Sequence, residues 1–262
     1  MLELARSGLA DLGAAIRLRN VWWELASEDI VDAHRKTLLG PIWPLLNFLL
    51  LVVALVLVLD NGGGGFSFAA YVASGMLVWF YISDVLSMSV TLFTREQAFI
   101  KGTVLPVSVY VLRQTLLVAT RFLYALAGAV PILLFTGIEV TPALLSLLPA
   151  FAVMLLAAPA TAVVLGIAGA YAPDLQFVVT NAVRLLMFVT PIFWTAGELG
   201  GIRGVLFHWN PFTHFIEIVR TPLIQGVVPL GSWAVVLTLT AFLLMGALFL
   251  LGKFKRLIVF QV

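Results

Sequence analysis

Three ionisable residues interrupt stretches of the chain that are otherwise apolar: Asp84, Arg121 and Arg184. A charge is costly to hold in the hydrocarbon of a bilayer, so such a residue faces the protein interior or a water-filled path. Counted along their helices, Asp84 and Arg184 lie at similar depth. We therefore expect Asp84 to pair with Arg184, with Arg121 as the alternative partner. The pair either neutralises charge structurally or faces a substrate path, and both interpretations stay open.

The helix faces that carry these charges have the side chains to contact a solute. Helical spacing groups Asp84 with Phe80, and it groups Arg184 with Asn181 and Phe188. Aromatic rings stack on the apolar faces of sugar rings, and the asparagine amide hydrogen-bonds to hydroxyl groups. Aromatic residues also face lipid in many membrane proteins, which is the alternative interpretation of these faces.

The elements that hold these residues are long apolar segments. The chain has 262 residues, of which 62% are hydrophobic and 11% are charged, and its mean hydropathy is +1.10. Soluble domains average about 25% charged residues, so this composition is typical of a multi-pass membrane protein. We expect an all-α fold in one transmembrane domain, 1–262, with six spans. The spans cover residues 42–59, 70–93, 109–135, 144–171, 177–194 and 233–251.

Two polar segments precede or connect the first three spans. Residues 11–37 mix Trp22 and Trp23 with charged residues, which predicts an amphipathic helix at the membrane interface. Packing of this helix on a partner is the alternative. Residues 95–105 form a charged loop between the second and third spans, and their composition is compatible with a helix.

A longer polar segment, 195–232, separates the fifth and sixth spans. It is too polar and too broken to span a bilayer, and it predicts two short helices on the membrane surface. Asn210 is suited to cap the second helix, with Pro211 at the first helical position. Phe212 and Phe215 then repeat at helical spacing.

Six spans place both termini on one side of the membrane, and the basic residues indicate which side. Eleven are expected beside the termini: Arg6, Arg17, Arg19, Arg35, Lys36, Arg95, Lys101, Arg113, Lys253, Lys255 and Arg256. Two, Arg203 and Arg220, are expected on the other side. Because cytoplasmic loops carry the excess of lysine and arginine, both termini should be cytoplasmic.

Several kinds of chemistry are excluded by what the sequence lacks. It has no cysteine, so it forms no disulfide or thiolate metal site. Its histidines, His34, His208 and His214, have no companions at metal-ligand spacing. No Lys-Ser or Lys-Thr pair follows the glycines at 62–65, so the phosphate-binding loop of an ATPase is absent. We expect a transport subunit rather than an enzyme, with no metal or cofactor of its own.

Two motifs carry a family resemblance. Residues 22–30 (WWELASEDI) and 34–44 (HRKTLLGPIWP) resemble the N-terminal signature of type-2 ATP-binding-cassette (ABC) exporters of polysaccharides. In that family an interface helix ends in a basic-Thr/Ser-x-Leu-Gly-x-x-Trp motif just before the first span. Residues 209–212 (WNPF) resemble the Asn-Pro-led helix that lies between spans five and six. The resemblance covers essentially the whole chain, although residues 27–32 are more acidic than the usually basic family segment.

This resemblance implies a homodimer that associates with two separate ATPase subunits, which bind ATP and Mg²⁺. The dimer would form a channel in the bacterial inner membrane, surrounded by membrane lipids and with no nucleic acid as a partner. Its cargo would be a polyprenyl-diphosphate-linked polysaccharide, such as the O-antigen of lipopolysaccharide biosynthesis. The first and fifth spans would line the channel.

Residue roles follow from the resemblance and from the polar faces together. The expected substrate path comprises Trp43, Asn47, Phe80, Asp84, Asn181, Arg184 and Phe188. The expected ATPase contacts are Arg95, Glu96 and Lys101. The expected external gate comprises Asn210, Pro211, Phe212, Phe215 and Arg220. Three alternatives share some of these features: a type-2 ABC exporter of a drug or small lipid, an ion-driven secondary carrier, and a structural membrane protein.

Overall fold

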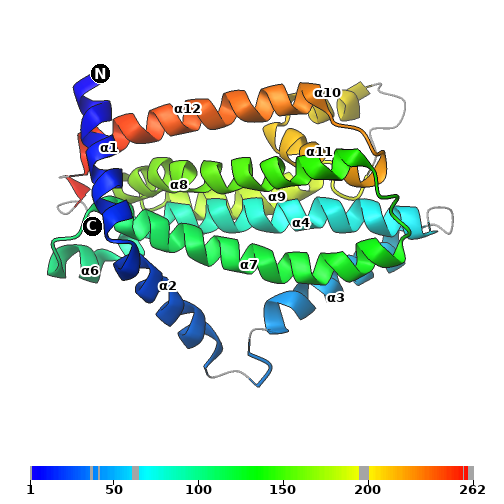
Figure 1. The fold of residues 1–262 in the computed structure, drawn as a ribbon, viewed down its shortest axis with the longest axis horizontal. Coiled ribbons are helices and arrows are strands. Elements are labelled where there is room, and N and C mark those ends of the chain that lie inside the picture. The colour runs from blue at the N-terminus through cyan, green and yellow to red at the C-terminus, as the bar shows by residue number, and fades with distance from the viewer. Residues whose placement is uncertain are drawn as a thin grey trace.

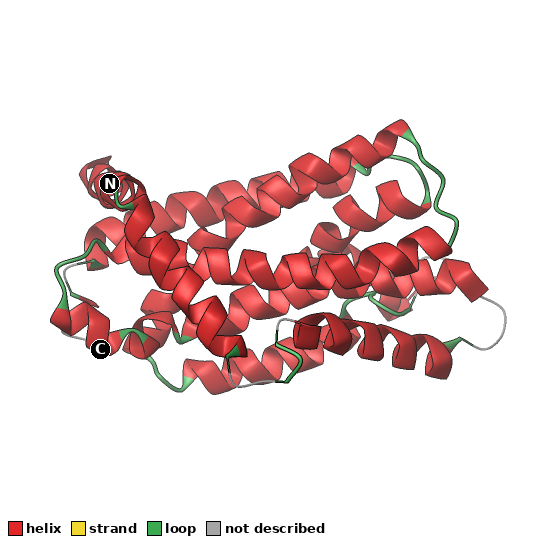
Figure 2. Cartoon of the chain, turned by 60° about the horizontal axis from the view of Figure 1, so that its bottom comes forward, coloured by secondary structure: helices red, strands yellow, loops and turns green. Residues whose placement is uncertain are grey.

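The computed structural model describes residues 2–35, 38–40, 42–60, 65–194, 201–255 and 257–258, which form helices and loops with no strand among them (Figures 1 and 2). The helices are α1 (Leu2–Arg17), α2 (Arg19–His34), α3 (Ile42–Leu59), α4 (Gly65–Val90), α5 (Leu92–Arg95), α6 (Gln97–Gly102), α7 (Val107–Phe135), the 3-10 helix η1 (Pro142–Ser146), α8 (Leu147–Tyr171), α9 (Leu175–Val189), α10 (Gly201–Trp209), α11 (Pro211–Ile224) and α12 (Leu230–Phe254). The expectation of an all-helical fold is confirmed for the described part of the chain.

The long helices form an elongated bundle around α4. Helices α3, α7, α8, α9 and α11 all pack on α4, and α12 packs on the far side of α8 (Figure 1). Helices α1, α5 and α6 lie at the end of the bundle where α12 finishes, which we call the α1 end. Helices α10 and α11 and η1 lie at the opposite end, the α11 end. Part of the apolar surface of these helices forms a common core, and many other apolar residues stay exposed on the outside of the bundle, as on α3, where only Phe48 and Val52 are buried.

Within the described residues, five helical segments are long and apolar enough to cross a membrane: Ile42–Leu59, Ser67–Val90, Val107–Phe135, Pro142–Tyr171 and Leu230–Phe254. The segment expected as the fifth span, 177–194, forms the shorter helix α9 of 15 residues. At 1.5 Å per residue this helix rises about 22 Å, less than the roughly 30 Å of a bilayer core. It stops because Thr190 is extended, as the residue before a proline usually is. Six spans therefore stay a prediction.

The N-terminal segment differs from the single interface helix expected over 11–37. Helix α1 begins at Leu2, and a turn at Leu18 separates it from α2. Helix α1 packs closely on α12. The approach is so close that a Cβ at Gly8 or Gly252 would overlap the backbone of the opposite helix. Residues 36–37 of the expected helix lie outside the described residues.

The region between α9 and α12 contains the two expected short helices, but α11 is not a surface helix. The expected cap is confirmed: Asn210 Oδ1 accepts a 3.0 Å hydrogen bond from the Phe212 N–H, with Pro211 at the first helical position. More than half of the residues of α11 are buried, because it packs on α4, α12 and η1. The expectation of a helix on the membrane surface is therefore wrong for α11. Residues 195–200 lie outside the described residues.

An aromatic ladder fixes α4, α7 and α8 beside one another. The rings of Tyr81 and Phe122 meet edge to face with centroids 5.3 Å apart, and Phe122 meets Phe151 in the same way at 5.3 Å. The Tyr81 hydroxyl also donates a 2.9 Å hydrogen bond to the Met154 carbonyl oxygen on α8. This ladder sets the spacing of the two helices that carry Asp84 and Arg121.

Candidate functional site

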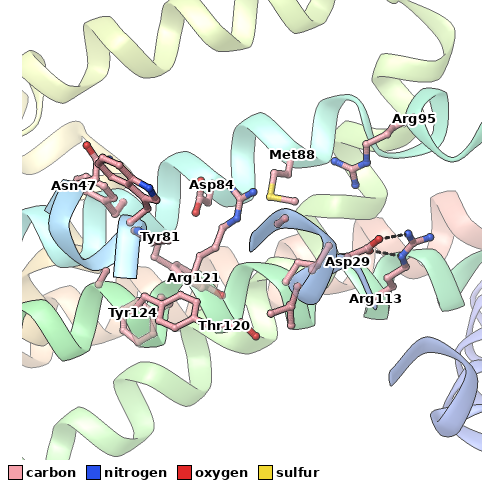
Figure 3. A pocket seen from close by; sticks show the side chains of 18 of the residues that line it. Asp29, Asn47, Tyr81, Asp84, Met88, Arg95, Arg113, Thr120, Arg121 and Tyr124 are labelled. Carbon is pink, nitrogen blue, oxygen red and sulfur yellow. Dashed lines mark hydrogen bonds and ion pairs between the residues drawn. The ribbon is translucent and has the colours of Figure 1, made fainter. Parts of the chain in front are cut away.

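A cavity of about 950 Å³ lies between α2, α3, α4, α6 and α7. In Figure 1, α2 and the start of α3 form the two arms of a V beside α7. Residues of both arms line the cavity together with residues of α4 and α7. Its lining combines aromatic rings with polar and charged side chains (Figure 3). This cavity is our candidate site.

Asp84 and Arg121 face each other across this cavity. Arg121 extends from α7 toward Asp84 on α4 (Figure 3), and its Nη1 lies 3.4 Å from Asp84 Oδ1. The pair is only partly covered by protein, since the Arg121 side chain is 52% exposed and that of Asp84 is 31% exposed. Both side chains therefore line the cavity while compensating each other's charge.

The expected pairing of Asp84 with Arg184 is wrong. Arg184 lies on an exposed face of α9, and no residue of this helix is buried. Counting residues along each helix gave a similar depth for the two side chains but could not give the direction of either. Asp84 points toward α7, so the alternative partner, Arg121, is the one that it contacts.

The residues expected in a substrate path fall into two groups. Trp43, Asn47 and Phe80 line the cavity together with Asp84. The other expected residues, Asn181, Arg184 and Phe188, lie on exposed positions of α9 and do not line the cavity. Phe48 on α3 packs on Phe80 with ring centroids 5.6 Å apart, which holds α3 against α4. Within one chain, the structure thus brings the first group together and leaves the second on the outside.

Arg113 forms the most connected ion network of the cavity. Its Nε and Nη2 donate to the two carboxylate oxygens of Asp29, each at 2.7 Å (Figure 3). Its Nη1 donates to Glu96 Oε2 at 2.6 Å. The Phe99 ring lies 5.5 Å from the same guanidinium. From the sequence, Arg113 was expected only among the cytoplasmic basic residues. Residues 27–32 are more acidic than the same segment of the polysaccharide exporters that the sequence resembles. This acidic run was the sequence signal that could have predicted a basic partner for α2.

The segment expected to contact an ATPase has both exposed and buried charges. Lys101 is exposed, and the Arg95 side chain is 40% exposed. Glu96 instead points inward with its side chain 8% exposed, because it binds Arg113. Arg95 Nη2 also donates to Gln114 Oε1 at 3.3 Å, and Gln114 Nε2 donates to Ser89 Oγ at 3.1 Å. Glu96 is therefore an internal anchor of this segment rather than an exposed contact.

The charges that line the cavity balance one another. Its lining contains three acidic residues, Asp29, Asp84 and Glu96, and three basic residues, Arg95, Arg113 and Arg121. Each of these arginines lies within 4 Å of at least one of the carboxylates. Among the described residues, no group of three His, Asp or Glu side chains is placed to hold a metal ion. The cavity therefore offers hydrogen bonds and ring faces with little net charge.

A second polar cluster lies at the α11 end, around the buried Arg220. Its Nη1 donates to the Pro191 carbonyl oxygen at 2.6 Å and its Nη2 donates to Ile192 O at 3.0 Å. Tyr71 stacks under the guanidinium at 3.7 Å, and the Glu217 carboxylate lies 3.6 Å from Nη1. Burial lowers the pKa of Arg220, while Tyr71 and Glu217 oppose that shift. Arg220 thus holds the segment after α9 against α4 and α11.

The other residues expected in an external gate surround this cluster. Asn210 Nδ2 donates a 2.8 Å hydrogen bond to Thr190 Oγ1, which ties the start of α11 to the end of α9. Phe212 packs edge to face on Trp79 of α4, with centroids 6.0 Å apart. Phe215 is half-buried and packs against the core. The segments on either side of 195–200 are therefore fixed by packing and hydrogen bonds.

Comparison with protein families matches residues 20–224 to the ABC-2 type transporters. The matched range runs from the start of α2 to the end of α11. It therefore contains the cavity with its Arg113 network and also the polar cluster around Arg220. The chain belongs to the ABC-2 type transporter family. It is a multi-pass membrane protein, the membrane subunit of an ABC exporter, and such permeases work with an ATP-binding partner. No curated protein matches the chain in sequence.

Proposed function

We propose that this ABC-2 permease exports a polysaccharide linked to a polyprenyl diphosphate from the cytoplasm across the bacterial inner membrane. Two copies of the chain associate with two ATPase subunits, which bind ATP and Mg²⁺, and both termini are cytoplasmic. The observation that carries the proposal is the polar and aromatic cavity at the bend between α2 and α3. Gly40 and Trp43 of the Leu-Gly-x-x-Trp sequence both line this cavity.

The side chains of the cavity suit a sugar ring. Six aromatic residues line it: Trp43, Phe80, Tyr81, Phe99, Phe122 and Tyr124. Asn47 and Thr120 add an amide and a hydroxyl group among these rings. Sugars present apolar ring faces to aromatic side chains and hydroxyl groups to amides, and both kinds of partner are present here.

The charge balance of the cavity also favours such a cargo. A balanced set of carboxylates and guanidinium groups neither attracts nor repels a neutral polyol strongly. Arg121 is more exposed than Arg95 and Arg113, and a single 3.4 Å contact joins it to Asp84. We assign Arg121 as the cation that meets the diphosphate when the lipid-linked glycan enters the cavity.

The outer face of α9 supports a homodimer. Asn181 and Arg184 are exposed on this helix, yet a polar side chain is costly to leave against lipid. A second copy packed on α9 would cover them. Together with α3, this face would then line the passage for the glycan, as the resemblance to polysaccharide exporters implies.

The turn formed by α5 and α6 is the proposed ATPase contact. Arg95 and Lys101 supply positive charge, and Phe99 and Val104 are exposed apolar residues beside them. Exposed apolar side chains flanked by charges are typical of a protein interface. Glu96 holds this surface in place from behind by binding Arg113.

Export of a drug or small lipid is the second candidate. The cavity volume of about 950 Å³ falls within the roughly 300–1,000 Å³ of pockets that enclose drug-sized ligands. Its aromatic lining would also suit a flat apolar molecule. The two functions share the fold and differ only in the cargo, so the cargo is what must be measured.

The test is reconstitution of the permease with its ATPase in proteoliposomes. ATP hydrolysis is measured with a polyprenyl diphosphate that carries a polysaccharide, with the same lipid lacking sugar, and with a hydrophobic dye. We expect stimulation and translocation with the glycan-bearing lipid alone. Trp43→Ala should lower this stimulation about tenfold, the effect of roughly 1.4 kcal/mol. Trp23→Ala, which removes a similarly exposed tryptophan outside the cavity, is the control. Stimulation by the dye but not by the glycan would overturn the proposal in favour of drug export.

A further inference from the structure

We propose that Arg113 is a positioning residue that makes α2, one wall of the cavity, follow the movements of the ATPase-facing segment α5–α6. The three groups Asp29, Arg113 and Glu96, which we call the clamp, come from three separate parts of the chain. Asp29 lies on α2, Arg113 on α7, and Glu96 at the junction of α5 and α6. The inference rests on the proposed ATPase contact but not on the identity of the cargo.

The geometry of the clamp fixes orientation as well as distance. The Asp29 carboxylate receives two parallel hydrogen bonds of 2.7 Å from Arg113, an arrangement that holds the two planar groups in one plane. The remaining nitrogen, Nη1, donates to Glu96 at 2.6 Å. A guanidinium can serve both acids at once because its donors point in fixed directions, which a lysine ammonium cannot reproduce. Rotation of α2 relative to α7 would break the paired bonds.

Burial makes the clamp cooperative. The Arg113 side chain is 10% exposed and that of Glu96 is 8% exposed, so water replaces these contacts poorly. If the guanidinium moved away, Asp29, whose side chain is 32% exposed, would lose both of its bonds to Arg113, and the buried Glu96 would keep only its 3.4 Å contact with Arg95. Breaking a buried ion pair in this way is strongly unfavourable. The three groups therefore tend to move together or not at all.

The position of Glu96 connects the clamp to the ATPase side. Glu96 is both the C-cap residue of α5 and the N-cap residue of α6, so it lies at the junction of the two helices. Its other carboxylate oxygen lies 3.4 Å from Arg95 Nε, and Arg95 is one of the exposed contacts proposed above. If the ATPase displaces Arg95 or α6, the displacement therefore acts directly on the Glu96 carboxylate that Arg113 binds.

The position of Asp29 connects the clamp to the cavity. Asp29, Ile30 and Ala33 of α2 all line it, opposite Trp43 and Asn47 of α3. Displacement of α2 along with Arg113 would change the distance between these two walls. The clamp thus links the state of the ATPase to the width of the cavity where we place the cargo.

Asp29→Asn separates this role from a general effect on folding. Asparagine keeps the shape of the side chain but has a single acceptor oxygen, so one of the two bonds to Arg113 is lost while Glu96 keeps its own. Glu28→Gln makes the same chemical change at the neighbouring residue of α2, which is exposed and outside the clamp. The two variants change the chain charge equally, and a difference between them reports the clamp.

The movement can be measured by double electron–electron resonance on the assembled complex. The chain has no cysteine, so spin labels attach only at introduced ones when the partner's cysteines have been replaced. One pair, Val31→Cys with Gln97→Cys, reports the distance between α2 and α6. The other pair, Gln97→Cys with Phe242→Cys, reports the movement of α6 against α12. Labelled chain is diluted with unlabelled chain so that each complex carries one labelled copy.

We expect ATP binding to change the 97–242 distance while the 31–97 distance stays constant in the wild type and in Glu28→Gln. In Asp29→Asn the 31–97 distance should change on ATP binding, because α2 no longer follows α6. A 31–97 distance that changes in the wild type, or stays constant in Asp29→Asn, would overturn the proposal. So would a 97–242 distance that does not respond to ATP, since there would be no movement to carry.

The functional readout is cargo moved per ATP hydrolysed. Asp29→Asn should lower this ratio at least fivefold, and Glu28→Gln should leave it unchanged. An unchanged ratio in Asp29→Asn would overturn the coupling role even if α2 were displaced. The distance measurements need nucleotide but no cargo, so they stay decisive if the proposed glycan proves to be the wrong substrate.

Discussion

The Arg220 guanidinium donates a 2.6 Å hydrogen bond to the carbonyl oxygen of Pro191, at the point where α9 has ended. The carbonyl oxygen of Ile192 is held by the same side chain at 3.0 Å. Because α9 stops short, these carbonyl groups have no helical partner and need a donor. Arg220 on α11 supplies this donor, so the side chain of α11 stabilises the end of helix α9.

Gly75 on α4 makes room for this guanidinium. A Cβ at Gly75 would overlap Nη2 of Arg220 and come within 3.1 Å of the Ile192 carbonyl oxygen. We expect Gly75→Ala to destabilise the fold by about 1–3 kcal/mol, the usual cost of overpacking a core. The apparent Tm in detergent should fall by about 2–4 °C per kcal/mol. Gly246→Ala on α12 is the matched control, because a Cβ there meets no atom within 4 Å. Equal apparent Tm values for the two variants would contradict this account.

The close crossing of α1 and α12 gives a second prediction. Gly8→Ala would drive a Cβ into the carbonyl oxygen of Leu248, whereas Gly13→Ala on the same helix meets nothing within 4 Å. Gly8→Ala should loosen α1 and speed tryptic cleavage after Arg6 and Arg17, measured by mass spectrometry of timed digests. Gly13→Ala should protect these sites as well as the wild type does, or better, since alanine favours a helix over glycine. The same cleavage rate in both variants would show that α1 is not held by this crossing.

The Asp84–Arg121 pair can be tested by a double-mutant cycle. Asp84→Asn and Arg121→Gln remove one charge each, and we expect a coupling of about 0.5–1 kcal/mol because the side chains lie 3.4 Å apart but are partly exposed. The cycle of Asp84→Asn with Arg184→Gln should be additive within about 0.5 kcal/mol, as for distant sites. Apparent unfolding free energies of the purified chain supply the data. Coupling to Arg184 rather than to Arg121 would contradict the observed arrangement.

The exposed charges of α5 and α6 give a prediction about assembly. Arg95→Gln with Lys101→Gln should weaken co-purification of the ATPase and lower hydrolysis in the complex, because two cations leave the proposed interface. The control is Arg6→Gln with Arg17→Gln, which removes two exposed cations from α1 at the same end of the bundle. Equal loss of the ATPase in both variants would indicate a general effect of charge rather than contact through α5–α6.

Much of the fold could be predicted from local patterns in the sequence. The run from Ile42 to Leu59 is apolar except for Asn47, and the helix observed there has these same bounds. Asn210 followed by Pro211 combines a side-chain acceptor with a fixed φ, and the cap forms as those residues dictate. Such signals depend on neighbours in the sequence alone, and for this reason they survive in the folded protein.

The parts that failed depend on contacts between distant segments. The depth of a residue along a helix can be counted from the sequence, but the rotation of the helix about its axis is set by packing. For this reason the sequence did not show that Asp84 contacts Arg121 rather than Arg184. The burial of α11 could not be predicted from the sequence, because the helices on which it packs, α4 and η1, are far away in sequence. Arg113 was overlooked for the same reason, since the acids that it binds lie on α2 and at residue 96. Of the residues expected in a substrate path, Asn47, Trp43 and Phe80 line the same cavity as Asp84, and their contact with a substrate stays a prediction.

The exposed face of α9 gives the last prediction, which concerns the proposed homodimer. Phe188 on α9 is 61% exposed, and Phe242 on α12 is 65% exposed, so the two side chains are equally accessible in a single chain. A hydrophobic ring facing lipid is unremarkable at either position. What distinguishes α9 is that Asn181 and Arg184 share its exposed surface, and these polar groups need a protein partner or water within the membrane.

Cysteine cross-linking in native membranes separates the two faces. Because the chain has no cysteine, Phe188→Cys and Phe242→Cys each place a single thiol on an otherwise unreactive protein. If two copies pair through α9, mild oxidation should join Phe188→Cys chains into a disulfide-linked dimer seen on non-reducing gels, while Phe242→Cys chains stay single. Cross-linking through Phe242→Cys alone would place the interface on α12 instead. In that case the exposed Asn181 and Arg184 would not be covered by a second copy, and the proposed passage between two copies would be lost.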